Sequence, residues 1–261
     1  MNHETMEELY QSIAHRKSVR KYSRQELLQE TLQKIEDFWE QTEQINPEEP
    51  VIMRILPAGH IKMRVGMSYR APYYIAVYAA DTEKGLLNAG FRLQQMDLWL
   101  SAHGIGSCWL HMMTPDQANA MADGMACQIT MGIGYSEEKL HRSESSEFKR
   151  KKLEQITNGG DYDTELEAVR IAPSATNSQL WYFEQTGAQI RAYMIQDNQG
   201  GEVYRKLHEM DMGIALCHLY LAASYKGMFR GFAYENEGTH KTGAAYILSV
   251  ILKQPKSIGL S

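Results

Sequence analysis

Two long apolar segments, each beginning near one glycine and ending at another, constrain the possible fold of this chain more than any other feature. Gly90 is followed by Gly104 fourteen residues later, and Gly213 is followed by Gly227 at the same spacing. The apolar residues between them predict two buried helices, and each helix precedes an apolar run that predicts a strand. The repeat indicates either an internal duplication or two unrelated helices that end in glycine, the commonest C-terminal cap.

Apolar periodicity predicts further elements on both sides of a linker. We expect helices over 6–13, 86–103 and 212–227, and strands over 51–56, 73–80, 129–135, 181–184 and 245–252. Ser23 and Glu26 form an S-x-x-E capping box, which predicts that another helix begins there. Its expected buried stripe is Leu28, Leu32, Ile35 and Trp39. The stretch 136–163 has low hydrophobicity and is interpreted as a linker that crosses between the halves.

Composition narrows the class of protein. With 261 residues, 43% of them hydrophobic, the chain can bury a large core. A net charge of −5 argues against general nucleic-acid binding. No apolar run approaches the roughly 18 residues of a membrane helix, and the N-terminus lacks the apolar stretch of a secretory signal. Three scattered cysteines fit a reducing compartment, so we expect a soluble, cytoplasmic protein.

Arginines and a serine alternate near the N-terminus in the pattern Arg16-x-Ser18-x-Arg20. If this stretch is extended, alternate side chains point the same way, so two guanidinium groups and a hydroxyl would converge. Guanidinium forks match phosphate oxygens. The alternative is the basic end of a helix, where positive charges complement the helix dipole. The pattern therefore predicts either a phosphate site or a solvated helix terminus.

A second segment, 172–181, packs small and hydrogen-bonding residues between an expected helix and an expected strand. Pro173 fixes its own φ, while Ser174, Thr176 and Asn177 can hold a turn that exposes backbone amides. Such a loop can lie against a flat polar ring and bind its edge. The alternative is an ordinary connection between a helix and a strand.

Other motifs exclude familiar chemistries. Trp109 stands where a GxGxxG fingerprint beginning at Gly104 requires its third glycine, so a Rossmann dinucleotide site is not expected. There is no GxSxG nucleophile elbow. Cys108 and His111 could form a thiolate pair or bind metal, but a buried structural cysteine is the commoner arrangement. We therefore expect neither a catalytic triad nor a metal site.

Together these segments resemble the nitroreductase family of FMN-dependent NAD(P)H oxidoreductases. Ser12–Tyr22 is similar to the family's R-R-S-x-R-x-F phosphate motif. Ala172–Trp181 is similar to its A-P-S-x-x-N-x-Q-P-W motif, with Leu180 in place of the usual proline. Ala102–Trp109 resembles the segment after the family's long dimer-interface helix. Lys149–Glu154 resembles R-K-P-L-E-E, also without the proline.

The order of these motifs departs from the usual family pattern. There the A-P-S-x-x-N motif follows the first long helix, whereas here residues 43–56 occupy that place and the motif occurs only in the second half. Ordinary members are homodimers whose flavin sites combine groups from both subunits. The resemblance therefore implies an α+β, nitroreductase-like fold with mostly antiparallel sheets flanked and separated by long helices. Two related halves, 1–155 and 156–261, would form an intramolecular pseudo-dimer that acts as a monomer.

The resemblance also assigns roles to residues. The FMN phosphate is expected at Arg16, Ser18 and Arg20, with Lys17 nearby and Arg150 closing from the linker. The other expected flavin contacts are Pro173, Ser174, Thr176 and Asn177 at the ring or ribityl chain, the backbone of His111 and Met112 at N5, and Arg64 at the pyrimidine edge.

The chemistry implied by the resemblance belongs to the flavin. NADH or NADPH would donate a hydride, and a small electron-poor acceptor such as a nitroaromatic or a quinone would then be reduced, without a side-chain acid or nucleophile. Three other classes stay open. These are a flavin-binding carrier without turnover, a family member with another reaction such as flavin breakdown or reductive dehalogenation, and a helical interaction protein without cofactor.

Overall fold

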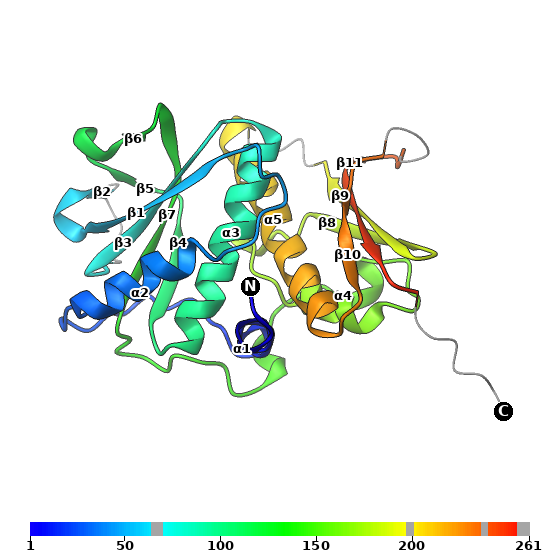
Figure 1. Cartoon of the computed structure of the whole chain (residues 1–261), viewed down its shortest axis with the longest axis horizontal. Coiled ribbons are helices and arrows are strands. Elements are labelled where there is room, and N and C mark those ends of the chain that lie inside the picture. The colour runs from blue at the N-terminus through cyan, green and yellow to red at the C-terminus, as the bar shows by residue number, and fades with distance from the viewer. Residues whose placement is uncertain (64–69, 197–200, 236–239, 255–261) are drawn as a thin grey trace. The chain divides into compact units, whose positions relative to one another are not determined.

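The computed structural model describes residues 1–63, 70–196, 201–235 and 240–254 (Figure 1). The chain divides into two compact units, a first unit of residues 1–147 and a second unit of residues 148–261. The division falls inside the stretch 136–163 that the sequence marks as a linker.

The first unit is a mainly antiparallel sheet with three helices. Its helices are α1 (His3–Ile13), α2 (Gln29–Trp39) and α3 (Glu83–Ala102). Its strands are β1 (Val51–Pro57), β2 (Ile61–Met63), β3 (Tyr73–Ala79), β4 (Gly106–Leu110), β5 (Met113–Pro115), β6 (Met121–Ala122) and β7 (Met125–Gly134). The main sheet has the order β1-β3-β7-β4, β6 extends β7, and β2 pairs with β5. β3 lies inside the sheet and is buried over almost its whole length, as its continuous apolar sequence predicts.

Helix α3 is buried from Gly85 to Ser101, although it contains several polar residues. It begins at Thr82, whose Oγ1 accepts a hydrogen bond from the backbone N–H of Gly85 at 3.0 Å. Its Arg92 donates to Thr42 Oγ1, to the Val51 carbonyl and to the Trp39 carbonyl, at 2.8 to 2.9 Å. Because buried polar groups need such partners, Arg92 fixes the connection between α2 and β1 against α3.

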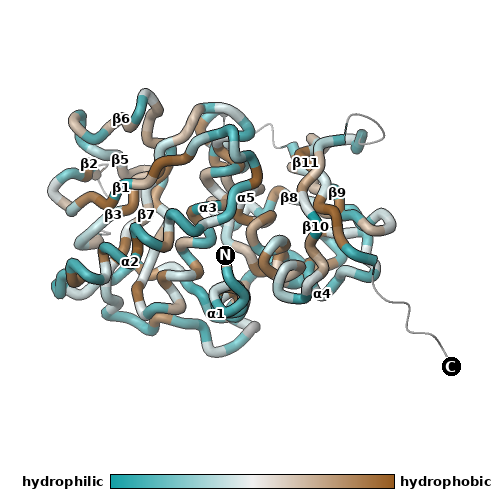
Figure 2. The backbone as a smooth tube through the Cα atoms, in the orientation of Figure 1, coloured by the Kyte–Doolittle hydropathy of each residue, from teal (hydrophilic) through white to brown (hydrophobic). Residues whose placement is uncertain are grey.

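The second unit contains two helices and a four-stranded antiparallel sheet. Its elements are α4 (Asp163–Arg170), β8 (Trp181–Thr186), β9 (Gln189–Ile195), α5 (Gly201–Tyr225), β10 (Phe229–Ala233) and β11 (Ala244–Leu252). The sheet order is β10-β11-β9-β8, and α4 packs against α5. Figure 2 shows hydrophobic residues along β9 and β11, the two inner strands.

The two main sheets have the same connectivity. In the first unit the chain runs β1, β3, α3, β4, β7, and in the second it runs β8, β9, α5, β10, β11. In each sheet the last of these strands lies between the second and the third. Each long helix therefore connects the second strand to the third at an equivalent point of the topology.

Most of the expected helices and strands are present, but two expectations need correction. The prediction that a helix begins with a capping box at Ser23 is wrong, because helix α2 begins at Gln29 and has no side-chain cap. The backbone N–H of Ser23 instead donates to the Tyr135 carbonyl at 2.8 Å, which keeps this stretch extended. Consequently Leu28 lies outside the helix and is 63% exposed, whereas Phe38 joins the buried face.

Helix α5 is also longer than its apolar sequence indicates. It begins at Gly201, upstream of the expected start at Met212. Charged pairs four residues apart, Lys206 with Glu202 and Arg205 with Glu209, support these extra turns. Within the described residues, no helix is long and apolar enough to cross a membrane.

Candidate functional site

The segment that carries Arg16, Ser18 and Arg20 is extended and runs beside β4, the edge strand of the first sheet. Ser18 forms a parallel bridge with Ser107, and the backbone N–H of Val19 donates to the Ser107 carbonyl at 2.8 Å. Nη1 of Arg16 lies 3.5 Å from Ser18 Oγ. The chain therefore adopts the extended alternative. The segment is not the basic end of a helix, because α1 stops at Ile13.

The neighbouring side chain on β4 is Cys108, next to Ser107. Burial raises the pKa of the Cys108 thiol, whereas Arg20, Arg16 and a hydrogen bond with Ser18 oppose this shift. Within the pattern, Arg16 contacts Ser18, so these two side chains lie together. Cys108 is a buried free thiol, as the structural interpretation of this cysteine predicts.

A buried carboxylate holds Arg16 in place. Asp97 on α3 is fully buried, and its Oδ2 lies 3.2 Å from Nη1 of Arg16. The same oxygen accepts a hydrogen bond from Trp109 Nε1 at 3.2 Å, and Oδ1 accepts one from Ser107 Oγ. Three elements, α3, β4 and the arginine segment, thus meet at one carboxylate, which sets the position of the Arg16 guanidinium.

A third arginine, Arg142, contacts the backbone of the segment that carries Arg16, and no sequence motif predicted it. Its backbone N–H donates to the His15 carbonyl at 2.9 Å, and its guanidinium donates to the Arg16 carbonyl. The pKa of Arg142 is lowered to about 10, mainly by burial and then by the charges of Arg16 and Arg20, against the opposing effect of Glu147 and Asp97. No motif spacing marks Arg142, because backbone pairing between Arg16 and His141 brings it here.

Lys17 points to a different partner. Its Nζ lies 3.8 Å from a carboxylate oxygen of Glu138, whose other oxygen accepts the backbone N–H of Arg20 at 2.7 Å. These contacts, the Arg20 amide first, hold the pKa of Glu138 below its usual value. Lys17 is therefore balanced by Glu138, whereas Arg16 is paired with Asp97.

The remaining site residues expected in the first unit lie elsewhere or outside the described residues. His111 and Met112 form the turn between β4 and β5, with His111 exposed and Met112 half-buried. Arg64 falls outside the described residues.

In the second unit, the predicted ring-binding loop connects α4 to β8. It contains Pro173, Ser174 and a short 3-10 turn over Ala175–Asn177. Thr176 and Asn177 have φ values of 52° and 60°, in the left-handed region that non-glycine residues rarely adopt. The loop is therefore held in an unusual shape by its surroundings.

Hydrogen bonds from a second segment hold this loop. Arg150 donates to the Ala172 carbonyl at 2.9 Å and to Asn177 Oδ1 at 2.7 Å, and Asn177 Nδ2 donates to the Lys149 carbonyl at 2.9 Å. Ser174 Oγ accepts the backbone N–H of Gln179 at 3.0 Å. Arg150, Ser174 and Asn177 are thus brought together, and their side chains shape the loop.

A buried carboxylate supports the loop from α5. Both oxygens of Asp211 accept the backbone N–H of Ala175, at 3.0 and 3.1 Å. Burial raises the pKa of Asp211 to about 7, although the hydrogen bond from Ala175 opposes this shift. Asp211 is therefore a buried acid that titrates near neutral pH in contact with the loop.

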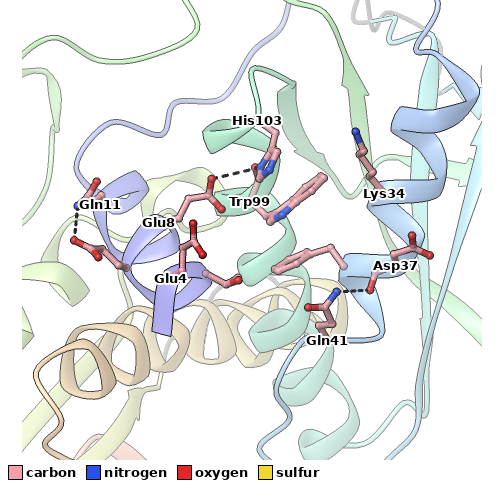
Figure 3. A pocket seen from close by; sticks show the side chains of 11 residues that line it. Glu4, Glu8, Gln11, Lys34, Asp37, Gln41, Trp99 and His103 are labelled. Atoms are coloured by element: carbon pink, nitrogen blue, oxygen red, sulfur yellow. Dashed lines mark hydrogen bonds and ion pairs between the residues drawn. The ribbon is translucent and has the colours of Figure 1, made fainter. Parts of the chain in front are cut away.

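A separate cavity of about 620 Å³ lies in the first unit among α1, α2 and the end of α3 (Figure 3). Phe38, Trp99 and His103 form a stack in its wall, with ring centroids 5.1 and 3.9 Å apart. Its carboxylates are Glu4, Glu7, Glu8 and Asp37. Because these negative charges repel an anion, this cavity is unsuited to a phosphate, unlike the arginine cluster.

An antiparallel sheet with a cluster of arginines at its edge, held by a long buried helix, defines an α+β protein with a candidate anion site. Residues 8–223 match the model of a protein family described as "Putative TM nitroreductase". The chain belongs to this nitroreductase family.

Solved structures of similar fold carry related names. A "putative nitroreductase" from Thermotoga maritima MSB8 matches with 21% identity and a TM-score of 0.64, covering 94% of this chain and 93% of that chain. This likeness shows that the two proteins share the fold over nearly their full lengths.

Shorter likenesses involve other proteins. An FMN-dependent nitroreductase from Clostridium difficile R20291 has 19% identity and a TM-score of 0.42, covering 53% of this chain and 93% of that chain. A "Putative NADH dehydrogenase/NAD(P)H nitroreductase" from Bacteroides thetaiotaomicron VPI-5482 has 16% identity and a TM-score of 0.41, covering 52% of this chain and 91% of that chain. No curated protein matches the sequence.

Proposed function

We propose that this protein is an FMN-dependent oxidoreductase whose first unit holds the phosphate of the cofactor. The observation that carries the proposal is the extended segment of Arg16, Ser18 and Arg20 beside β4, with Arg16 against Ser18, in a chain of the nitroreductase family. A phosphate monoester carries a charge of about −1.5 to −2 at neutral pH and accepts several hydrogen bonds. Guanidinium groups and a hydroxyl supply the matching donors.

The residues of the cluster fit such a group in their exposure as well as their charge. Arg20 is exposed and Ser18 is partly exposed, so an anion can reach them from solvent. Arg16 lies behind them, 3% exposed, and its guanidinium is fixed by Asp97. The site therefore combines a fixed inner donor, which loses little side-chain entropy on binding, with accessible outer donors.

For the second unit, the proposal assigns Pro173, Ser174, Thr176 and Asn177 to contacts with the flavin ring or ribityl chain. The left-handed turn at Thr176 and Asn177 supports this assignment, because a loop kept in an uncommon conformation is often a binding element. Since Ser174 and Asn177 already bond within the unit, backbone groups and Thr176 would make most direct contacts. Arg150 would act by holding Asn177.

When bound, FMN supplies hydride transfer between NADH or NADPH and an electron-poor small molecule. The proposal keeps the backbone of His111 and Met112 near N5 and Arg64 at the pyrimidine edge, both from the family resemblance. It also includes the intramolecular pseudo-dimer and a cytoplasmic, monomeric protein. The equal connectivity of the two sheets supports an origin by duplication.

The visible absorption spectrum of the purified protein, recorded without oxygen before and after adding NADH or NADPH, tests this function. We expect oxidised flavin bands that bleach with at least one nucleotide and return when a nitroaromatic or a quinone is added. A bound flavin that neither nucleotide reduces would instead favour a carrier or a different flavin reaction. A protein that binds no FMN, even after incubation with it, would contradict the proposal.

A further inference from the structure

We propose that Arg142 is a third arginine of the phosphate site, and that the cluster selects a terminal phosphate monoester dianion. The inference rests on the proposed function, because it takes FMN as the ligand that carries this phosphate. Arg142 lies outside every segment that resembles a family motif.

Backbone contacts fix Arg142 beside the motif. The backbone N–H of Arg142 donates to the His15 carbonyl at 2.9 Å, and the neighbouring His141 pairs with Arg16. The guanidinium donates to the Arg16 carbonyl, so its far end lies at the segment rather than extending into solvent. Arg142 is partly buried, so part of its side chain stays open to solvent.

The charges of the cluster specify the ligand. Arg16, Arg20 and Arg142 each carry one positive charge and influence one another, while Asp97 contributes one negative charge. Glu147 also acts on Arg142, so three positive charges face two negative charges and leave a formal charge of +1, which favours an anion. Two arginines close together repel each other at low effective dielectric, and a dianion between them would relieve this repulsion. A phosphate monoester carries about −1.5 to −2 at neutral pH, so the positive cluster attracts it.

Selectivity between two flavins follows from this charge balance. FMN and riboflavin share the isoalloxazine ring and the ribityl chain, and only FMN ends in a phosphate. Contacts with Arg142 should therefore strengthen the binding of FMN and leave that of riboflavin unchanged. This difference distinguishes an arginine that binds the phosphate from one that only supports the fold.

The test is equilibrium binding of FMN and of riboflavin to the full-length protein freed of bound flavin. Arg142→Gln should weaken FMN binding about 10- to 100-fold, the usual effect of losing a charged hydrogen bond. Its affinity for riboflavin should stay within about twofold of the original. Arg142→Lys should recover part of the loss, because a point charge replaces a planar fork. Arg24→Gln, at an exposed arginine further along the same segment, is the matched control and should bind both flavins normally.

Two results would overturn the inference. One is FMN binding by Arg142→Gln that equals the original, and the other is an equal loss for FMN and riboflavin. If the variant does not fold, Arg142→Lys decides, since it must bind FMN more weakly than the original protein and bind riboflavin normally. A protein that binds neither flavin would defeat the proposed function. The phosphate site would then be judged by whether inorganic phosphate raises the Tm of the original protein more than that of Arg142→Lys.

Discussion

Arg16 and Asp97 form a buried ion pair in which Nη1 lies 3.2 Å from Oδ2, with side chains 3% and 0% exposed. Asp97 also accepts hydrogen bonds from Ser107 and Trp109 on β4. The pair therefore connects the helix, the edge strand and the arginine segment. Removing one charge of a buried pair leaves the other charge without compensation, which costs more than losing the pair as a whole.

Asp97→Asn should lower the free energy of unfolding by about 3 to 5 kcal/mol, because Arg16 then keeps a buried charge without its counter-ion. Urea unfolding followed by circular dichroism measures this change. Asp37→Asn is the control, since Asp37 is exposed on α2, and its effect should stay within about 0.5 kcal/mol. Equal stability of the two variants would show that the Arg16–Asp97 pair does not support the fold.

Gly106→Ala should damage the arginine segment through packing. A Cβ at Gly106 would lie 2.9 Å from the Cβ and Cγ1 of Val19, which stands between Ser18 and Arg20. We expect a loss of about 1 to 3 kcal/mol in unfolding free energy and weaker FMN binding, because overpacking displaces Val19. The added Val19→Ala change should restore FMN binding by making room. Gly59→Ala, where no atom lies within 4 Å of the new Cβ, is the control.

Asn177 combines a left-handed backbone with side-chain bonds to Lys149 and Arg150. Asn177→Gly removes the bonds but accepts a φ of 60°, whereas Asn177→Ala loses the bonds and strains the backbone. The alanine variant should therefore be less stable than the glycine variant by about 1 to 2 kcal/mol. Thermal unfolding of both variants measures the difference. Equal Tm values would mean that the loop relaxes out of the left-handed conformation.

Asp211 predicts a pH dependence of stability. Burial raises its pKa in the folded protein to about 7, above the ordinary value of 3.8. The folded state therefore binds this proton more tightly than the unfolded state does. The resulting stability is fully present below pH 3.8 and is lost as the pH rises to about 7, by roughly 4 kcal/mol in all.

Asp211→Asn should remove this part of the pH dependence, since an amide oxygen still accepts the Ala175 N–H and does not ionise. Above pH 7 the variant should be more stable than the original protein. Urea unfolding at several pH values from 5 to 8 measures this, with Asp161→Asn, at an exposed carboxylate, as the control. Parallel curves for the original protein and Asp211→Asn would contradict the raised pKa.

Local patterns in the sequence predicted much of the fold. The continuous apolar run of β3 and the amphipathic α1 are present as expected, because burial of a whole strand or of one helix face leaves a direct periodic signal. The predicted start of α2 was wrong because the capping pattern at Ser23 competes with a tertiary contact. The backbone of Ser23 bonds to Tyr135, and this long-range pairing overrides a local preference.

The candidate site was likewise predictable only in part. By itself, the sequence determined that Arg16, Ser18 and Arg20 would share one side if extended, because side chains alternate along a strand. Only the tertiary structure decided that the segment is extended, since the edge strand β4 supplies the pairing groups through Ser107. Asp97 and Arg142 could not be found from spacing, because they lie on α3 and in the linker, far from the motif in sequence. Charge–charge contacts depend on distance in space, and folding alone sets that distance.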